Sequence, residues 1–541
     1  MSTMMGSSIS SLPTEIRRQQ NGLYLNDRHG GFIKVTTGAV VTDSGPSIGG
    51  TWGDFNNDGN LDLFVTNRQP GSGPPVGNFL YLGMGDTSFT KITVGSPVTD
   101  RANSNSSSWV DVDNDGHLDL FVVNFQQDNF LYRNSGPPGF TFTRIDSGAI
   151  VRDGNNFSIV GAWADVNNDR KPDVFIGNSG TQNDVLFINE GNGGLAATGI
   201  TDGRATLGAS WGDYDNDGYP DLFVTNYLNQ NNILYRNSGP PGFTLVPVDT
   251  GALVHDGGNS VGSVWGDFDN DGDLDLFVAN DGGVPFLYLN NGPPGYGFTK
   301  VTTGDLVNTV ANSFGCAAAD YDNDGALDLF IANRLNQRSF LYRNDGNSNH
   351  WVTMRCVGVT TNRAAIGAKV RILATIGGTP RWQLREVEAQ TGYNSQTLWL
   401  HFGFGNAAVI DSARIEWPSG QADVLTGLAP DRIITVTEGR GVTGVHAPAA
   451  QVLPVATGLE PAFPNPFNPS TNITFRLFSG GLVSLRVFDA LGRQVKVLAE
   501  GRLEPGTYRK SWDASGFASG VYYVRLQAGP TMQTRKLLLM K

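Results

Sequence analysis

Short apolar stretches, separated by turns rich in Gly, Pro and Asn, follow one another along most of this chain. Six of them are nearly continuous in their apolar character: LDLFVTN, LDLFVVN, PDVFIGN, PDLFVTN, LDLFVAN and LDLFIAN. Such runs are typical of strands that are buried on both faces of a sheet. Each is followed by an aromatic stretch such as NFLYRN, often a turn spelled SGPPG, and a short FTRI-like stretch. No amphipathic helical period is evident, so the pattern predicts an all-β chain.

The stretches belong to a repeating unit with an acidic loop between its first and second strands. Four short strands at this period are the signature of a β-propeller. A Trp precedes the loop by two residues in five copies, and Ala318 takes its place in the sixth. We expect packing and turn roles for the Trp and for an Asn that stands thirteen residues after each loop begins, namely Asn67, Asn124, Asn178, Asn226, Asn280 and Asn333.

The sequence alone does not determine the number of blades. Six loop-bearing units are visible, but the aromatic third strand occurs seven times, beginning with LYLN at Leu23. One arrangement lets FIKV (Phe32–Val35) close the last blade, with LYLN as an orphan strand. Residues 1–22 read as an N-terminal tail without an apolar signal region, and a truncated or disordered N-terminus is one explanation.

Composition narrows the classes of function. The formal net charge of -13 argues against a nucleic-acid partner. Only Cys316 and Cys356 occur, which we interpret as buried free thiols in strands and not as a disulfide framework. No segment is apolar for the 18 residues that a membrane span needs.

The acidic loops carry the clearest chemistry. They read DFNNDGNLD, DVDNDGHLD, DVNNDRKPD, DYDNDGYPD, DFDNDGDLD and DYDNDGALD. Side-chain oxygens at loop positions 1, 3, 5 and 9, with a backbone carbonyl at position 7, match the all-oxygen shell of Ca²⁺. Glycine at position 6 permits the sharp turn. The absence of Cys and of His side chains at the ligand positions argues against zinc or copper.

The sequence therefore predicts about six calcium sites. The third should be the weakest, because Asn167 replaces Asp at position 3 and Arg170 replaces Gly at position 6. The predicted ligands are Asp54, Asn56, Asp58, Asn60 and Asp62; Asp111, Asp113, Asp115, His117 and Asp119; Asp165, Asn167, Asp169, Lys171 and Asp173; Asp213, Asp215, Asp217, Tyr219 and Asp221; Asp267, Asp269, Asp271, Asp273 and Asp275; and Asp320, Asp322, Asp324, Ala326 and Asp328, with position 7 acting through its carbonyl.

Units such as VWGDFDNDGDLDLFVAN and NFLYRNSGPPGFT resemble the FG-GAP/VCBS repeat family, which includes the integrin α-subunit propellers. The resemblance covers residues 23–346. It implies a calcium-binding β-propeller whose metal loops lie on one face and whose ligands bind the opposite face. The connections from the fourth strand of one unit to the first strand of the next would line that opposite face.

Residues 347–440 form a strand-rich block without acidic loops. Its motifs NRAAIGA, GYNSQ, HFGFG and WPSG resemble the ASPIC/UnbV domain of the cartilage acidic protein family. The resemblance implies a β-sandwich-like accessory module of undefined biochemical role. Arg363, Glu386 and His401 could be imagined as a catalytic set, but no nucleophile stands at a readable spacing from them. A structural role is therefore favoured.

The C-terminal part divides into a Pro/Gly-rich linker at 441–461 and a small domain at 462–541. Alternating strands led in by PNPFNPST predict an immunoglobulin-like sandwich. The block resembles the type IX secretion sorting domain and, equally, the FlgD-like immunoglobulin domain. The first resemblance implies the secretion machinery as a partner and an extracellular or outer-surface location in a bacterium. The alternative is a permanently attached cap.

Together these features predict a secreted or cell-surface, calcium-dependent protein that binds a protein or a glycan, for instance in adhesion. One alternative is an extracellular polysaccharide lyase or hydrolase built on a propeller, and a second is a structural surface-layer component. An enzyme would need a proton-transfer set or a carboxylate pair across the scissile bond. The six His are scattered and the excess Asp lies in the metal loops, so we expect no enzymatic activity.

Overall fold

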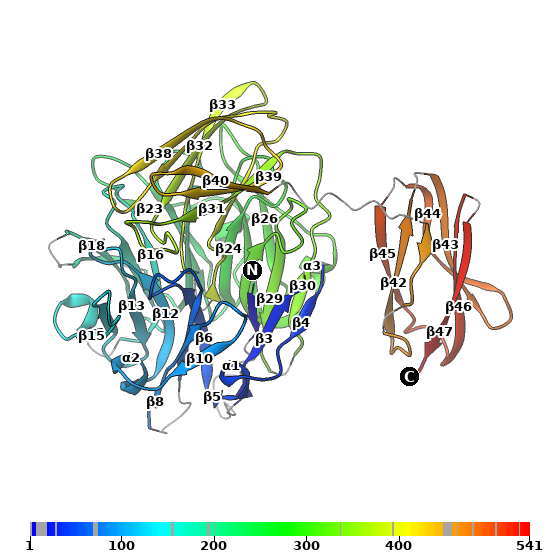
Figure 1. Ribbon diagram of the computed structural model, residues 1–541, viewed down its shortest axis with the longest axis horizontal. Helices are drawn as coiled ribbons and strands as arrows, with labels where there is room; N and C mark the ends of the chain where they lie inside the picture. The colour runs from blue at the N-terminus through cyan, green and yellow to red at the C-terminus, as the bar shows by residue number, and fades with distance from the viewer. Residues whose placement is uncertain are drawn as a thin grey trace. The chain divides into compact units, whose positions relative to one another are not determined.

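The computed structural model consists of two compact units, Met1–His446 and Ala447–Lys541, which are described separately below. Figure 1 shows both, with strands almost throughout, and the predicted all-β fold is confirmed. The described residues are 3–6, 19–27, 30–68, 74–152, 156–191, 195–200, 202–335, 337–391, 394–446, 457–462, 464–478, 481–503, 506–529 and 531–541.

Six repeats make up most of the first unit, each an antiparallel sheet of up to four strands like the blade of a propeller. The first strands of the repeats are β6 (Ser47–Gly53), β12 (Ser104–Val110), β16 (Ser158–Ala164), β20 (Thr206–Gly212), β24 (Ser260–Gly266) and β28 (Ala311–Ala319). The second strands are β7 (Asp62–Asn67), β13 (Asp119–Asn124), β17 (Asp173–Asn178), β21 (Asp221–Asn226), β25 (Asp275–Gly283) and β29 (Asp328–Asn333).

The outer strands are shorter and more exposed. The third strands are β9 (Phe79–Gly83), β14 (Phe130–Asn134), β18 (Asp184–Asn189), β22 (Ile233–Asn237), β26 (Phe286–Asn290) and β30 (Phe340–Tyr342). The fourth are β10 (Phe89–Ile92), β15 (Phe142–Ile145), β19 (Leu195–Ile200), β23 (Leu245–Pro247) and β27 (Phe298–Lys300). Before the first repeat lie α1 (Ala39–Thr42) and the short strand β5 (Ser44–Gly45), and between later repeats lie α2 (Ser96–Thr99), β11 (Arg101–Ala102), η1 (Ala149–Val151), η2 (Ala252–Val254) and α3 (Asp305–Asn308). The short strand β8 (Val76–Gly77) lies within the first repeat, between β7 and β9.

Burial explains why the second strand is apolar without alternation. Every residue of β13 is buried, because the neighbouring repeats cover both of its faces. The Trp of the first strand reaches the preceding repeat, where Trp109 Nε1 donates to the carbonyl of Thr51 at 3.3 Å. At the end of β13, Asn124 Oδ1 accepts a bond from Ser104 Oγ at 2.9 Å. The packing and turn roles predicted for the Trp and Asn positions agree with these contacts.

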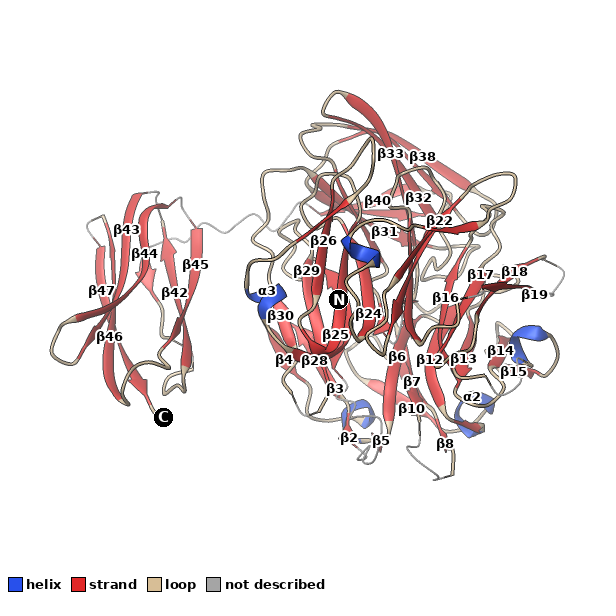
Figure 2. Cartoon of the chain, turned by 180° about the vertical axis from the view of Figure 1, so that it is seen from behind, coloured by secondary structure: helices blue, strands red, loops and turns tan. Residues whose placement is uncertain are grey.

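The N-terminal segment contributes a hairpin of β3 (Gly22–Asn26) and β4 (Phe32–Lys34), with β1 (Thr3–Gly6) beside β3. In Figures 1 and 2 this hairpin lies next to the sixth repeat. Asn26 Nδ2 donates to the carbonyl of Tyr321 at 2.5 Å. Asn134 makes the same bond, at 2.9 Å, to Phe55 of the repeat before its own.

The hairpin thus meets the sixth repeat as each repeat meets the one before it. The arrangement in which FIKV closes the last blade and LYLN is an orphan is wrong, because the two strands pair with each other. The expected tail at 1–22 also contains paired residues, in β1 and in β2 (Gln19–Gln20), which pairs with β5. The rest of that tail, apart from Asn21, lies outside the described residues or begins β3.

Two four-stranded sheets form the module that follows the repeats, in the orders β36-β31-β39-β40 and β33-β32-β37-β38. Their strands are β31 (Trp351–Val357), β32 (Lys369–Ile376), β33 (Thr379–Glu386), β36 (Trp399–Gly403), β37 (Ile410–Glu416), β38 (Ala422–Leu428), β39 (Arg432–Thr437) and β40 (Gly441–His446). Residues 441–446 were expected in the linker, but β40 pairs with β39 and belongs to this module. Of the remaining expected linker, residues 447–456 lie outside the described residues.

The module inserts a small hairpin, β34 (Gln390–Thr391) and β35 (Asn394–Ser395), among the first strands of the repeats. β35 pairs in parallel with β6, and the Trp52 amide donates to Ser395 Oγ at 3.2 Å. β34 contacts β12, β16, β20 and β24, while β35 also contacts β28. The hairpin therefore touches the first strand of all six repeats and lies along the axis that they surround.

The second unit is a sandwich of two antiparallel sheets in the orders β41-β42-β45 and β44-β43-β46-β47. Trp512, Phe475 and Leu485 are fully buried between the sheets. The strands are β41 (Gly458–Leu459), β42 (Ser470–Leu477), β43 (Gly481–Asp489), β44 (Gln494–Leu503), β45 (Gly506–Asp513), β46 (Gly520–Ala528) and β47 (Thr531–Leu539).

The prediction for the two cysteines is confirmed, since Cys316 and Cys356 are both buried and unpaired. Within the described parts of the chain, we find no helix with the length and apolar character that crossing a membrane requires.

Candidate metal centres

The acidic loops hold their shape through their own carboxylates. In the second loop, Asp111 accepts the backbone N–H of Asp115 at 3.0 Å and that of Gly116 at 2.9 Å. Asp119, at position 9, accepts the amide of Val112 at 3.2 Å and that of Asn134 at 2.8 Å. Gly116 has a φ of 87°, a conformation that L side chains rarely adopt. The first and last ligand positions therefore shape the turn as well as facing its centre.

Position 7 was expected to act through its carbonyl, and its backbone amide is held by a bond to the carboxylate of position 5. The amide of Asn60, for example, donates to Asp58 Oδ1 at 2.7 Å. The same bond orients His117, Lys171, Tyr219, Asp273 and Ala326.

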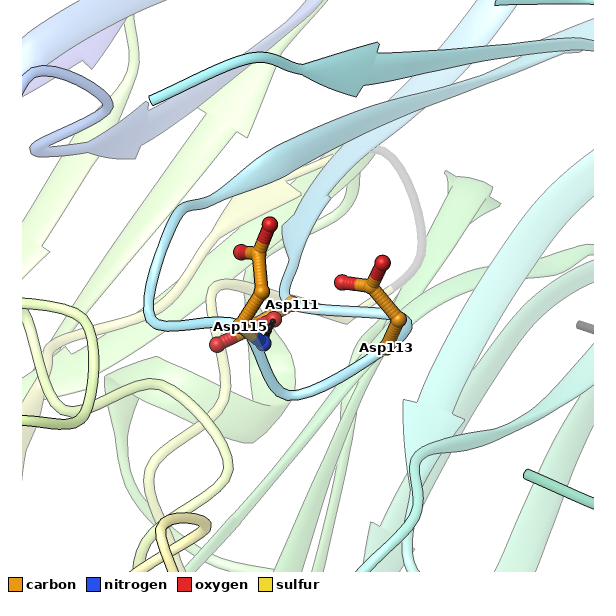
Figure 3. A group of neighbouring side chains, drawn as sticks. All are labelled: Asp111, Asp113 and Asp115. Atoms are coloured by element: carbon orange, nitrogen blue, oxygen red, sulfur yellow. Dashed lines mark hydrogen bonds between the residues drawn. The ribbon is translucent and has the colours of Figure 1, made fainter. Parts of the chain in front are cut away.

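Four of the six loops bring three carboxylates together, with one oxygen of each within 4.8 Å of the others. Figure 3 shows the group in the second loop, where the carboxylates of Asp113 and Asp115 project from the same side of the turn. The groups are Asp111, Asp113 and Asp115; Asp213, Asp215 and Asp221; Asp267, Asp269 and Asp271; and Asp320, Asp322 and Asp328.

Electrostatics make these groups unstable without a cation. Burial, and then the charges of neighbouring aspartates, raise the pKa of Asp213 and Asp267 to about 8. Burial also raises the pKa of Asp111 to about 8. Buried carboxylates this close together cannot all stay charged unless protons or a metal ion neutralise them.

The residues present fit a hard divalent cation such as Ca²⁺. Each group offers only oxygen ligands, which Ca²⁺ prefers. Asp213 Oδ1 and Asp322 Oδ1 are buried and have no hydrogen-bond partner among the described residues. Unsatisfied buried carboxylate oxygens are costly, and a coordinated cation would remove that cost. A bound Ca²⁺ would cross-link loop positions that are distant along the turn, and so hold the first and second strands together.

Arginines in the third strands, or directly after them, also reach these loops, and sequence reasoning missed these contacts. Arg133 contacts Asp113 Oδ2 at 2.5 Å and Asp119 Oδ2 at 3.1 Å. Arg236 pairs with Asp215 and Asp217, and Arg343 with Asp322 and Asp324. The available signal was the residue before the third-strand Asn, which is Arg in repeats two, four and six. These guanidiniums partly balance the carboxylates of their loops.

The first and third loops differ from the other four, because their described residues form no such group of three carboxylates. In the first loop Asn56 stands at position 3 and donates to Asp58 Oδ2 at 3.0 Å. In the third loop Lys369, from β32, places its ammonium 2.9 Å from Asp165 Oδ2. The sequence predicted a weak third site but not this lysine, which lies 204 residues further along the chain.

An Asn at loop position 4 joins each loop to the next. Asn57 Nδ2 donates to the carbonyl of Gly116 at 2.9 Å, and Asn114 Nδ2 donates to that of Arg170 at 2.7 Å. The series continues with Asn168 to Gly218, Asn216 to Gly272 and Asn270 to Gly325. All six loops have Asn at this position, which could have revealed a shared role.

The module of residues 351–446 packs on this loop face. The amide of Gly403 donates to Asp267 Oδ2 at 3.0 Å, and His401 Nε2 hydrogen-bonds Asn270 Oδ1 at 2.7 Å. Arg371 Nη1 donates to the carbonyl of Gly218 at 3.1 Å. The acidic loops therefore lie at an internal interface of the first unit.

The three residues considered as a catalytic set contact three different loops. His401 contacts the fifth loop, the Arg363 amide donates to Asn57 of the first at 2.7 Å, and Glu386 accepts the amide of Asp165 in the third at 3.4 Å. Burial, and then the charge of Arg385, lower the pKa of His401 to about 3, so this imidazole is neutral at physiological pH. These contacts serve the interface between module and loops.

Comparison with known proteins assigns families to three parts of the chain. The FG-GAP-like repeat matches residues 111–176, 165–224, 213–278 and 267–331. ASPIC and UnbV matches residues 358–443, and the secretion system C-terminal sorting domain matches residues 461–540.

Among whole proteins, the chain is similar to cartilage acidic protein 1. The mouse (Mus musculus) protein is 28% identical over 183 residues, which cover 32% of this chain and 27% of that protein. The human (Homo sapiens) protein is 28% identical over 169 residues, covering 29% and 25%. The matched region therefore spans about a quarter of these relatives.

One solved structure, described as the structural basis of specific recognition of non-reducing terminal N-acetylglucosamine by an Agrocybe aegerita lectin, aligns with a TM-score of 0.41 at 15% identity. The alignment covers 61% of this chain and 89% of that one. By its family matches, the chain carries FG-GAP-like repeats, an ASPIC and UnbV domain and a C-terminal sorting domain, and the last marks it as a secreted or cell-surface bacterial protein.

Proposed function

We propose that this protein is a calcium-loaded propeller that binds an extracellular glycan or protein on the face opposite to its metal loops, as an adhesion protein would. Calcium would act structurally, by neutralising the carboxylate groups of the loops and joining the first two strands of each loaded repeat. The ASPIC and UnbV domain packs on the loop face, through Gly403, His401 and Arg371 among others. The opposite ends of the strands remain for a ligand.

The proposal rests on a position at which the six repeats differ in residue type. The residue directly after the last Asn of each second strand differs in nearly every repeat, whereas the Asn itself never does. These six variable residues are Arg68, Phe125, Ser179, Tyr227, Asp281 and Arg334. Binding residues are often carried at strand ends and loops, and the variation makes this surface asymmetric, as a single asymmetric ligand would require.

The variable residues are arranged as aromatic and charged groups in contact. The Arg68 guanidinium lies 3.9 Å from the centre of the Phe125 ring, which stacks on Phe157 at 5.1 Å. On the other side, Tyr227 donates its hydroxyl to Asp281 Oδ2 at 2.6 Å, and Arg334 pairs with Asp281. Half-buried aromatic rings beside charged hydrogen-bonding groups suit a sugar ring or a peptide side chain.

Beneath them lies a small apolar cluster that closes this end of the axis. Ile48, Ile159, Leu207 and Val261 come from the first strands, and Phe125, Tyr227 and Phe314 pack against them. The aromatic side chains therefore rest on a firm base, which limits the entropy that they would lose on binding a ligand.

The proposal is tested by glycan-array and surface-protein binding with the full chain in calcium. Tyr227→Ala and Phe125→Ala should each weaken binding at least tenfold. Val246→Ala, at an exposed position of the outer strand β23, is the matched control and should bind as the unaltered protein does. Equal binding by all four proteins would refute the assignment of the ligand face.

A further inference from the structure

The third acidic loop keeps the shape of the others although its sequence departs from theirs. Asp165 accepts the amides of Asp169 at 2.9 Å and Arg170 at 2.7 Å, as the first Asp of the second loop does with positions 5 and 6. Arg170 adopts a φ of 68° where the other loops have glycine. Its turn therefore has the same geometry, but it lacks the carboxylate of position 3, where Asn167 stands.

A lysine ammonium reaches the first ligand of this loop. Lys369 begins β32 and is 3% exposed. Its Nζ lies 2.9 Å from Asp165 Oδ2, donates to the Asp165 carbonyl at 2.8 Å, and donates to Asn168 Oδ1. Three oxygens of one loop thus surround a single buried cation.

The other charged carboxylate that faces solvent in this loop is also paired. Lys171 Nζ lies 3.3 Å from Asp169 Oδ2. Asp173 is engaged by two backbone amides, those of Val166 at 3.1 Å and Asn189 at 2.7 Å. A metal ion at this turn would lie close to the Lys369 ammonium, whose burial leaves its charge little screened by water, and near the more exposed and better screened ammonium of Lys171.

The fifth loop shows the contrast. There the same domain contributes a neutral donor, the Gly403 amide, to Asp267 Oδ2. Its carboxylates Asp267, Asp269 and Asp271 lie within 4.8 Å of one another, as a cation would require. One domain thus meets the first Asp of the third loop with an ammonium and the first Asp of the fifth with a peptide N–H. Its cationic contact in the fifth loop is at position 7, where Arg381 lies 3.1 Å from Asp273 Oδ2.

We propose that the third loop takes no calcium, and that the Lys369 ammonium is its resident cation and locks the ASPIC and UnbV domain onto the repeats. This attachment would then persist when calcium is removed. The inference rests on the proposed calcium loading only for its comparison with the fifth loop, since the ion pair itself needs no metal.

The test counts bound ions in the full chain by equilibrium dialysis with radioactive calcium. Asp267→Asn should lose one calcium per molecule, whereas Asp165→Asn should lose none. Both substitutions keep the size of the side chain, and each replaces one of the two oxygens that accept loop amides, so the two loops are perturbed alike. Loss of one calcium in Asp165→Asn would overturn the inference.

A second measurement is independent of calcium. In excess chelator, Asp165→Asn, Lys369→Met and the double variant are compared by thermal melting. The two single substitutions should lower the midpoint and the double should lower it by less than their sum, because each removes the partner of the same pair. Additive effects would overturn the inference. If Asp267→Asn bound as much calcium as the unaltered protein, the proposed metal loading would fail. The non-additivity of Asp165→Asn and Lys369→Met would then decide the inference alone.

Discussion

The two ends of each repeat are held together by different chemistry. At one end, buried aspartates surround the turn between the first and second strands, and four such turns gather three carboxylates. At the other end, a neutral pair closes the same two strands, as Ser260 Oγ does with Asn280 Oδ1 at 2.8 Å. The polar groups of the neutral pair form their hydrogen bonds within the chain. The charged end needs something from solution, either protons or a metal ion.

The two ends should therefore differ in how their contribution to the free energy of unfolding depends on solution conditions. The contribution of the end with the acidic loops should depend on calcium and pH, whereas that of the end with the neutral pair should depend on neither. The third loop is an exception at the metal end, because Lys369 brings its own charge to Asp165.

Calcium removal should have the largest effect. If each of the four groups binds with a Kd of ~0.1 mM at ~2 mM free calcium, linkage gives ~1.8 kcal/mol per site and ~7 kcal/mol in all. That is comparable to the stability of a whole domain. Thermal melting of the full chain with calcium and with chelator measures it, and an unchanged midpoint would show that the loops hold no metal.

Breaking the neutral end should cost less and should not depend on calcium. Asn280 is buried, accepts from Ser260 and donates from Nδ2 to the carbonyl of Val284 at 2.8 Å. Asn280→Ala removes the acceptor of the Ser260 hydroxyl and the donor to the Val284 carbonyl, and a buried group left unsatisfied costs roughly 1–3 kcal/mol. The loss in midpoint should be equal with calcium and with chelator. Asp267→Asn is the matched variant, and its loss should depend on calcium; the reverse pattern would contradict the comparison.

The pH should also change the stability of the calcium-free protein, by up to ~1.4 kcal/mol per pH unit for each proton released on unfolding. Asp111, Asp213 and Asp267 have a pKa of about 8 when folded, above the ordinary value of 3.8. The folded, calcium-free protein therefore holds protons more tightly than the unfolded chain. This contribution is complete below about pH 4 and is lost as the pH rises towards 8.

The dialysed, calcium-free protein should accordingly melt at a higher temperature at pH 5.5 than at pH 8. Calcium must displace these protons, so its affinity should change in the opposite direction and be greater at pH 8. Calorimetric titration at the two pH values in two buffers of different ionisation enthalpy would detect the released protons. Equal affinity and no proton release would show that the aspartates are already charged.

The sequence predicted the local features well, since they depend on short spacings. The strand pattern, the loops and the three family resemblances could all be found within single repeats or motifs. Contacts between distant segments could not be, because no local period encodes them. Lys369 and Asp165 are 204 residues apart, and Asn394 pairs with Gly50 across an even longer interval. The misplaced linker start had another cause, because the Gly-rich composition of Gly441–His446 hid a strand of the preceding module.

The hairpin of β34 and β35 has a consequence for how the molecule is made. It contacts the first strand of every repeat, yet it follows all of them along the chain. The first repeats can form their own sheets early, but the groups that face the axis find these partners only after residue 395 has emerged. Such late, distant contacts slow folding. The order of the segments therefore delays completion of the first unit of this secreted protein until the hairpin is available.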